Sequence, residues 1–140
     1  MTVTFVGHKD TPQSIYHSLY EALKILIQTE EVADFYVGHQ GAFDRMALRA
    51  LCELKKIYPF IKTHIVLAYM PCEEEKSPLG CTTLFPEEVA VAPARFAIDR
   101  RNRWMIEKSD IIIAYVKRSY GGAAAFRRKA VARGKRIIDL

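Results

Sequence analysis

Apolar positions follow two different periods along the chain, and the alternation between them predicts strands separated by helices. Three short runs rich in β-forming residues predict strands: TVTFVG at 2–7, ADFYVG at 33–38 and KTHIVLAYM at 62–70. Between these runs, residues 11–30 and 42–59 repeat apolar side chains at the helical spacing of about 3.6. The apolar stripes of these two predicted helices are Ile15, Leu19, Leu23 and Leu26, then Met46, Ala50 and Leu54.

The last third of the chain returns to the same alternation. Residues 96–109 predict a helix, DIIIAYV at 110–116 predicts a fully buried strand, 121–134 predict a helix and 135–140 predict a final strand. The intervening residues, 71–99, hold four prolines and two cysteines and show neither period. We expect this stretch to be loop-like or only briefly structured. A connection of this length in a compact domain is usually functional or mobile, so a long loop or lid is expected there.

Strands that alternate with helices predict an α/β fold with a parallel sheet. We expect a Rossmann-like three-layer αβα sandwich, with a five-stranded parallel sheet of order 3-2-1-4-5, in one domain over residues 1–140. In such sheets ligands bind beyond the carboxyl ends of the strands, where the strand order reverses. This rule makes the ends of the first and fourth predicted strands the first place to look for a site.

Composition narrows the class of protein further. Half of the 140 residues are hydrophobic and 26% are charged, which is typical of a globular protein and not of a disordered one. The longest apolar runs are far shorter than the roughly 18 residues that cross a bilayer. We therefore expect a soluble, cytoplasmic protein without a membrane partner, and exposed apolar helix positions leave a homodimer or higher homo-oligomer open.

The net charge of +5 is unevenly distributed. Residues 95–136 hold 13 Lys or Arg and three acids, so the basic character lies in the last third of the chain. Such a region can contact nucleic acid, a phosphate-bearing small molecule, or only solvent and neighbouring acids.

The cysteines predict neither disulfides nor a metal centre. Cys52, Cys72 and Cys81 form no CxxC pair, and reduced thiols are expected in a cytoplasmic chain. Cys72 and Cys81 combined with His39 or His64 do not match the spacing of a zinc site. We expect no metal and no required cofactor.

Glycines and polar residues follow the predicted strands. Gly7 and His8 end the first strand, Gly38, His39 and Gly41 follow the second, and Gly121, Gly122 and Ala123 open the last helix. Small residues at a helix start either let the helix pack close to the sheet or expose backbone N–H groups that bind a phosphate. The chain has no GxGxxG fingerprint and no GK[ST] Walker loop, so hydrolysis of ATP by a P-loop is not expected.

Several side chains near the expected site carry candidate chemistry. Asp44 in the first helical turn either caps that helix or faces the ligand, where it can bind ribose hydroxyls or act as a catalytic acid or nucleophile. Of the RRNR run, Arg101 and Asn102 are expected to face the ligand, with Arg100 and Arg103 at the surface or in salt bridges. His8 and His39 either bind phosphate, transfer protons or only satisfy loop carbonyls.

Three segments together resemble a known superfamily. FVGHKDTP, DFYVGHQGAFDRMA and RFAIDRRNRWMIEKSDIIIAYVKRSYGGAAAFRRKAVARGKRIIDL are similar to the SLOG superfamily, and most to its YpsA-like branch. That superfamily also includes DprA and the Lonely Guy phosphoribohydrolases. The resemblance implies a pocket for a nucleotide or a derivative such as ADP-ribose or NAD, formed by Gly38, Gly41, Asp44, Arg101, Asn102, Gly121 and Gly122.

The sequence leaves three functions open. The leading hypothesis is a module that binds or senses a nucleotide derivative, and the second is an N-glycosidase or nucleoside transferase that uses Asp44. The run YGGAAAFRR lacks the Pro, Thr and Glu of the Lonely Guy motif PGGxGTxxE, which disfavours that particular enzyme activity. Binding of single-stranded nucleic acid through Arg95 to Arg136 is the third hypothesis.

Overall fold

Six strands alternate with helices in the computed structural model, which describes residues 1–70 and 80–140. The strands are β1 (Thr2–Gly7), β2 (Asp34–Val37), β3 (Lys62–Val66), β4 (Cys81–Leu84), β5 (Ile111–Tyr115) and β6 (Arg136–Asp139). The α-helices are α1 (Tyr16–Glu30), α2 (Gly41–Ile57), α3 (Glu87–Ala90), α4 (Ala97–Lys108) and α5 (Gly122–Ala132). Two short 3-10 turns, η1 (Gln13–Ile15) and η2 (Ala94–Phe96), precede α1 and α4.

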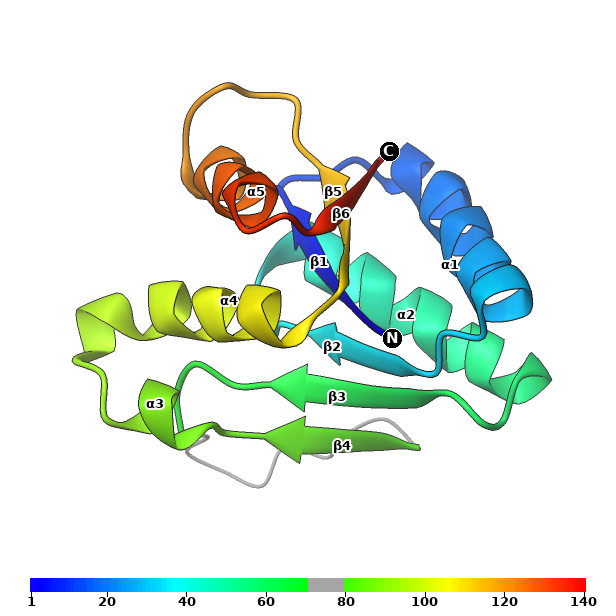
Figure 1. Cartoon of the computed structure of the whole chain (residues 1–140), viewed down its shortest axis with the longest axis horizontal. Coiled ribbons are helices and arrows are strands. Elements are labelled where there is room, and N and C mark those ends of the chain that lie inside the picture. The colour runs from blue at the N-terminus through cyan, green and yellow to red at the C-terminus, as the bar shows by residue number, and fades with distance from the viewer. Residues whose placement is uncertain (71–79) are drawn as a thin grey trace.

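The strands form one parallel sheet in the order β4-β3-β2-β1-β5-β6 (Figure 1). The expected α/β fold and the relative order of the five expected strands are confirmed, but the expected strand number of five is wrong. The additional strand is β4, which pairs with β3 at the sheet edge. Both central threonines of its sequence, CTTL, are exposed. The strand therefore contains no apolar run by which it could be recognised.

Helices cover both faces of the sheet, giving the expected three layers (Figure 1). On one face, Leu19 and Leu23 of α1 and Leu51 and Leu54 of α2 pack around Phe35 of β2, all fully buried. The smaller cluster on the other face is Val6, Ile106, Ile112, Phe126 and Ala130, from β1, α4, β5 and α5. All five residues of β5 are buried, as the run DIIIAYV predicted. Among the described residues, no helix is both long and apolar enough to cross a membrane.

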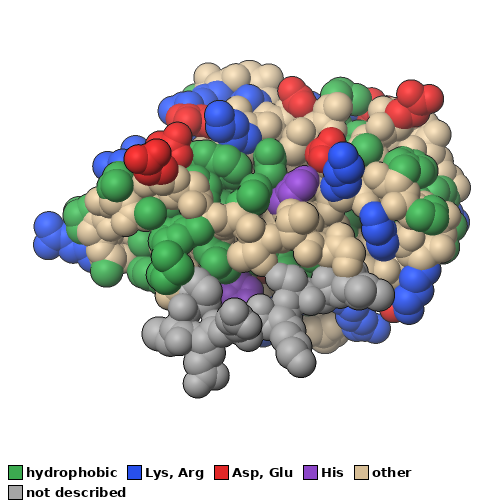
Figure 2. Space-filling model, turned by 90° about the horizontal axis from the view of Figure 1, so that it is seen from below, with side chains coloured by type: hydrophobic (Ala, Val, Ile, Leu, Met, Phe, Trp, Pro, Cys, Tyr) green, Lys and Arg blue, Asp and Glu red, His purple; other side chains and the backbone are tan. Residues whose placement is uncertain are grey.

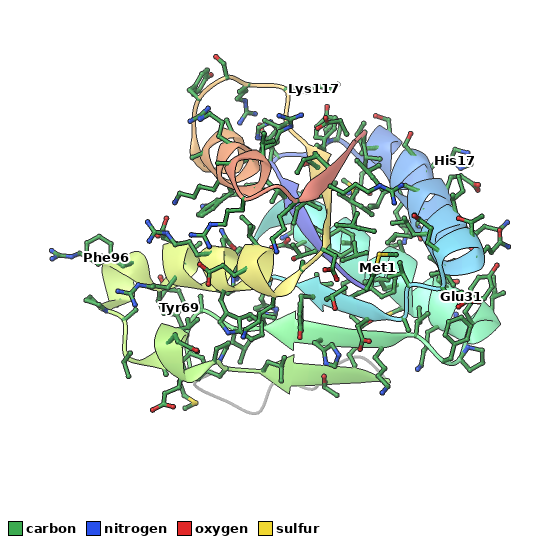
Figure 3. All side chains as sticks on the ribbon, in the orientation of Figure 1. Met1, His17, Glu31, Tyr69, Phe96 and Lys117 are labelled. Carbon is green, nitrogen blue, oxygen red and sulfur yellow. The ribbon has the colours of Figure 1, made fainter. Side chains whose placement is uncertain are left out.

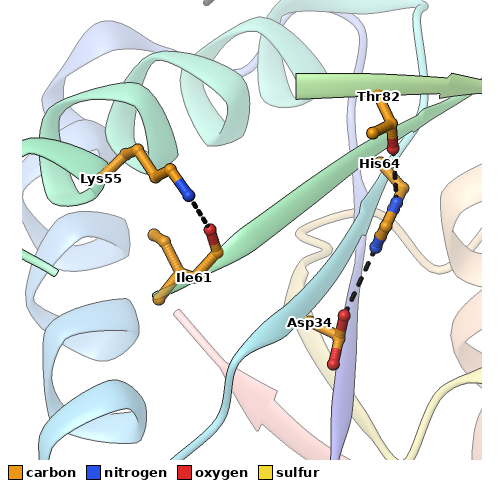
Figure 4. Close-up of polar contacts among 5 residues, drawn as sticks. All are labelled: Asp34, Lys55, Ile61, His64 and Thr82. Atoms are coloured by element: carbon orange, nitrogen blue, oxygen red, sulfur yellow. Dashed lines mark hydrogen bonds and ion pairs between the residues drawn. The ribbon is translucent and has the colours of Figure 1, made fainter. Parts of the chain in front are cut away.

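A row of polar and aromatic side chains links β2, β3 and β4 (Figure 4). The Nδ1 atom of His64 lies 2.5 Å from Thr82 Oγ1, and its Nε2 atom lies 3.4 Å from Asp34 Oδ1. Tyr36 contacts both the His64 ring and, at a centroid distance of 5.1 Å, the indole of Trp104 on α4. These contacts hold β4 in register with the rest of the sheet.

The segment expected to be one long loop contains regular structure in its described part. Residues 80–99 include β4, α3 and η2, and residues 71–79 lie outside the described residues. Tyr69 donates a hydrogen bond of 3.0 Å from its hydroxyl to Ala94 O, beside the end of the molecule where Phe96 lies (Figure 3). Hydrophobic side chains gather at this end (Figure 2), and the exposed ones include Tyr69, Met70, Val91 and Phe96. The described part of the expected loop is therefore made of short elements joined by irregular backbone.

Candidate functional site

A cavity of about 480 Å³ opens where the strand order reverses, beside the carboxyl end of β1 and the start of α5. This is the position at which sheets of this type bind ligands. Eight of the eleven expected site residues line it: Gly7, His8, Asp44, Arg101, Asn102, Gly121, Gly122 and Ala123. Gly38, His39 and Gly41 do not line it. The site thus combines residues from both ends of the sequence.

The turn before α5 presents bare backbone to the cavity. Gly121 is the N-cap residue, with φ 90° and ψ −179°, a conformation that essentially only glycine adopts. A Cβ placed on Gly121 or Gly122 would meet no described atom within 4 Å, and no described side chain caps the helix. The first N–H groups of α5 are therefore open to a ligand, at the end where the helix dipole is positive.

Asp44 and Arg101 approach each other over Gly38. A Cβ on Gly38 would lie 2.6 Å from Asp44 Oδ2 and 3.1 Å from Arg101 Cζ, closer than such contacts normally occur. Gly38 is buried and does not line the cavity itself. Its missing side chain creates the space in which the carboxylate and the guanidinium are placed.

Arg101 is a buried cation with spare hydrogen-bonding capacity. The residue is 2% exposed, and its Nε and Nη2 atoms both donate to Asn102 Oδ1, at 3.1 and 3.0 Å. Burial lowers the pKa of Arg101, and the nearby Asp44 and Tyr69 oppose that shift. The Nη1 atom is buried and has no hydrogen-bond partner among residues 1–70 and 80–140. A donor left in this state costs free energy, which an anionic ligand would recover.

Burial makes Asp44 easier to protonate than an exposed aspartate. Burial raises its pKa above the usual value of 3.8, although a hydrogen bond of 3.0 Å from Gln40 N and the charges of Arg101, His39 and Arg45 act in the opposite direction. The bond from Gln40, the N-cap residue of α2, also shows that the capping role is real. Asp44 both caps α2 and lines the cavity.

His8 lines the cavity, but one of its ring nitrogens is already bonded. His8 is 7% exposed, and its Nε2 atom accepts a hydrogen bond of 2.9 Å from Lys117 N, which places the proton of the neutral ring on Nδ1. Burial, followed by the charge of Arg118, lowers the pKa of His8 below 6.5, while Asp10 opposes the shift. The neutral imidazole connects the loop after β1 to the loop after β5.

Two of the expected binding glycines have packing roles. A Cβ on Gly7 would lie 2.2 Å from the ring of Phe43, so its absence lets α2 pack against β1. Gly41 has φ 85° and lies against Lys9, whose carbonyl oxygen accepts a 2.9 Å bond from Ala42 N. His39 belongs to the same turn and, like Gly41, lies outside the cavity lining.

Much of the basic last third is neutralised by acids. The ion pairs are Arg103 with Asp99, Arg118 with Asp10, Arg127 with Asp139, Lys129 with Asp99, Arg133 with Glu107 and Arg136 with Glu30. Arg100 is exposed, so Arg100 and Arg103 take the surface and salt-bridge positions expected of them.

A second hollow of about 380 Å³ lies between the loop after β5, helix α5 and the last two residues of the chain. Its lining includes Lys117, Arg118, Arg127 and Arg128. Figure 3 shows Lys117 at the end of β5.

Sequence reasoning missed several residues that line the cavity. Lys9, Asp10 and Arg118 follow β1 and β5, so the rule on strand ends was sufficient to find them. The apolar wall was not recognisable, because its members also belong to ordinary helix stripes: Ile98, Met105, Ile106 and Phe126. The described part of the chain contains no group of three or more potential metal ligands, and Cys72 lies outside it.

The fold and its switch-point cavity define a Rossmann-type α/β protein. A solved structure with a similar fold is the X-ray structure of DNA processing protein A (DprA) from Streptococcus pneumoniae, with a TM-score of 0.68 and 17% sequence identity. The match covers 99% of this chain and 49% of that one, so this chain spans about half the length of DprA. No family model matches the sequence, and no curated protein matches it either.

Proposed function

We propose that this protein binds a nucleotide or a nucleotide derivative, with a phosphate held at the start of α5. The observation that carries this proposal is a shared cavity wall: the open Gly121–Gly122 turn and the incompletely bonded Arg101 line the same space. Backbone N–H groups at a helix start and an Arg fork are two common ways of binding phosphate oxygens. Here the open turn and Arg101, of which only Nη1 is unbonded, line one cavity.

The remaining walls suit the rest of a nucleotide. Asp44 offers carboxyl oxygens to ribose hydroxyls. Asn102 offers its amide NH2 group as a donor, because its Oδ1 already accepts from Arg101. Met105 and Phe126 provide apolar surface for a base. A cavity of about 480 Å³ is in the range of small-molecule sites, roughly 300–1,000 Å³.

The resemblance to the SLOG superfamily supports the same assignment. We propose membership of its YpsA-like branch, a single domain over residues 1–140, a cytoplasmic location and self-association. The DprA fold is consistent with this superfamily. ADP-ribose and NAD are the ligand types that the resemblance favours, with no additional cofactor.

Thermal denaturation with a panel of ligands tests the proposal. The panel contains ADP-ribose, NAD, nucleoside monophosphates and inorganic phosphate, with unphosphorylated nucleosides as matched controls. A ligand at 100 times its dissociation constant stabilises the protein by about 2.7 kcal/mol, which raises the melting temperature measurably. Stabilisation by the phosphorylated members alone supports the proposal, and an unchanged melting temperature across the panel contradicts it.

An N-glycosidase or nucleoside transferase is the second candidate, favoured by the environment of Asp44. A carboxyl group whose pKa is raised by burial is suited to act as a general acid. Release of free base from a nucleoside monophosphate, abolished in Asp44→Asn but kept in the exposed-site variant Asp110→Asn, supports this activity. Unchanged monophosphate after prolonged incubation contradicts it.

Binding of single-stranded nucleic acid is the third candidate. The basic residues around the second hollow adjoin the cavity, because Arg118 lines both. The ion pairs of Arg118 with Asp10 and of Arg127 with Asp139 reduce the charge available there. Affinity for single-stranded DNA that falls steeply with salt supports this role, and absence of binding at low salt contradicts it.

A further inference from the structure

Two cysteine thiols from different elements meet at the edge of the sheet. Cys52 lies in α2 and Cys81 is the first residue of β4, and both are free and partly buried. Cys52 is among the groups that raise the pKa of Cys81, which places the two side chains near each other. The sheet register and the packing of Gly80 against α2 give the geometry of this approach.

The register of the sheet explains why Cys81 faces α2. Cys81 pairs with Thr63, which is 4% exposed, and His64 pairs with Thr82. Side chains alternate between the two faces of a sheet. Because Thr82 contacts His64 on the α4 face, Cys81 projects to the opposite face, which α2 covers.

The backbone next to Cys81 also lies close to α2. The Cβ that Gly80 lacks would be 3.3 Å from Lys55 Cε, so this residue touches the helix. Lys55 is three residues after Cys52 and therefore on the same side of α2. The ammonium group of Lys55 donates to Ile61 O at the start of β3 (Figure 4) and, at 2.6 Å, to Pro59 O. The end of α2 is thereby fixed to the segment before β3, the strand with which β4 pairs.

We propose that Cys52 and Cys81 form a reversible oxidative cross-link that ties the edge strand β4 to α2. With a disulfide oxidant such as oxidised glutathione, one thiolate displaces one glutathione thiolate and forms a mixed disulfide. The second cysteine thiolate then attacks the protein sulfur and releases the second glutathione. The two cysteines lose two electrons and two protons in all, and one glutathione disulfide becomes two glutathione thiols.

The local environment sets how the reaction depends on pH. Burial, with a further contribution from the neighbouring Cys52, raises the pKa of Cys81 to about 11. Only thiolates attack disulfides, so Cys81 is mostly unreactive near neutral pH. Oxidation of the pair is therefore faster in mildly alkaline buffer than at neutral pH.

The cross-link would act on one of the two edge strands of the described sheet. β4 has four residues, lies at the edge and pairs only with β3 among the described residues. A disulfide there stabilises the fold chiefly by restricting the unfolded chain. The nucleotide cavity lies beyond β3 and β2, so oxidation is expected to leave ligand binding unchanged.

Peptide mapping of the oxidised full chain tests the proposal. Trypsin separates the three cysteines, since Cys52 falls in residues 50–55, Cys72 in 63–76 and Cys81 in 77–95. After treatment with oxidised glutathione and blocking of free thiols, we expect peptide 50–55 joined to 77–95, with a mass about 2 Da below their sum. The control Cys72→Ser keeps this product, and dithiothreitol removes it.

Cys52→Ser and Cys81→Ser show whether the cross-link acts on stability. Oxidation is expected to raise the melting temperature of the wild type and of Cys72→Ser by at least about 5 °C. The melting temperatures of Cys52→Ser and Cys81→Ser are expected to stay unchanged. A main product that joins Cys72 to another cysteine overturns the proposal. Glutathione adducts without a cross-link in the folded chain overturn it as well.

Discussion

The carboxylate of Asp44 and the guanidinium of Arg101 lie against the same point of the backbone, the unsubstituted Cα of Gly38. One residue comes from the first turn of α2 and the other from α4, which cover opposite faces of the sheet (Figure 1). Gly38 follows β2, and a Cβ there would lie 2.6 Å from the carboxylate and 3.1 Å from the guanidinium carbon. The pair therefore depends on the absence of one methyl group.

Gly38→Ala is expected to destabilise the protein by about 1–3 kcal/mol, because the added methyl forces buried groups apart. The atoms that must move are Asp44 Oδ2 and Arg101 Cζ, both of which belong to side chains that are held by other contacts. Urea denaturation measures the loss. Gly122→Ala is the matched control, since a Cβ there meets no described atom within 4 Å. Equal stability of Gly38→Ala and wild type would contradict the close approach.

The two glycines before α5 are expected to respond differently to alanine. Gly121→Ala places a side chain at φ 90°, which costs on the order of 1–3 kcal/mol. Gly122 lies in the first helical turn without a positive φ, so Gly122→Ala is expected to be neutral or slightly stabilising. Chemical denaturation of both variants checks this difference. A similar loss in both would contradict the backbone conformation of the turn.

Arg101→Met is expected to weaken binding of a phosphorylated ligand at least about tenfold, because a charge-assisted hydrogen bond is lost. The substitution also leaves the buried Asp44 without a neighbouring positive charge, so Arg101→Met is expected to be less stable than the wild type, and binding is measured well below its melting temperature. Calorimetric titration measures the affinity, and circular dichroism checks the fold. Arg100→Met, at the exposed neighbouring position, is the control and should bind as the wild type does. Equal affinities for the two variants would exclude Arg101 from the site.

Stability is expected to fall as the pH drops below 6.5, through the protonation of His8. The folded state lowers the pKa of His8, so the unfolded chain binds the proton more readily. The stabilisation from the neutral ring is therefore complete above pH 6.5 and is lost as the pH falls through the folded pKa. Urea denaturation between about pH 5 and pH 8 measures this slope for wild type and His8→Gln.

His17→Gln is the control for this pH series, because His17 is exposed on α1 (Figure 3). The slope below pH 6.5 should be shallower in His8→Gln and unchanged in His17→Gln. The same slope in all three proteins would show that the burial of His8 does not control this pH dependence.

The sequence predicted the parts of the fold that depend on burial. β5 and the stripe Met46, Ala50 and Leu54 were recognisable because a buried surface requires apolar residues at a fixed period. β4 was not recognisable, because its two threonines are exposed and its pairing with β3 is a long-range contact.

The same distinction applies to the candidate site. Residues at strand ends were predicted to converge, and the parallel sheet brings Gly7, Asp44, Arg101 and Gly121 to one cavity. The roles of Gly7 and Gly41 depend on contacts with Phe43 and Lys9, which no local pattern reveals. The unbonded Nη1 of Arg101 likewise follows from tertiary packing alone.

The central claim, that a phosphate binds at the start of α5, is tested most directly by amide chemical shifts in the ¹⁵N-labelled protein. Titration with ADP-ribose or a nucleoside monophosphate should move the N–H signals of Gly121, Gly122 and Ala123 more than those of β4, together with the side-chain signals of Arg101. The unphosphorylated nucleoside should leave these amides in place. Saturable binding that shifts other residues while the Gly121–Ala123 amides stay unchanged would contradict the account.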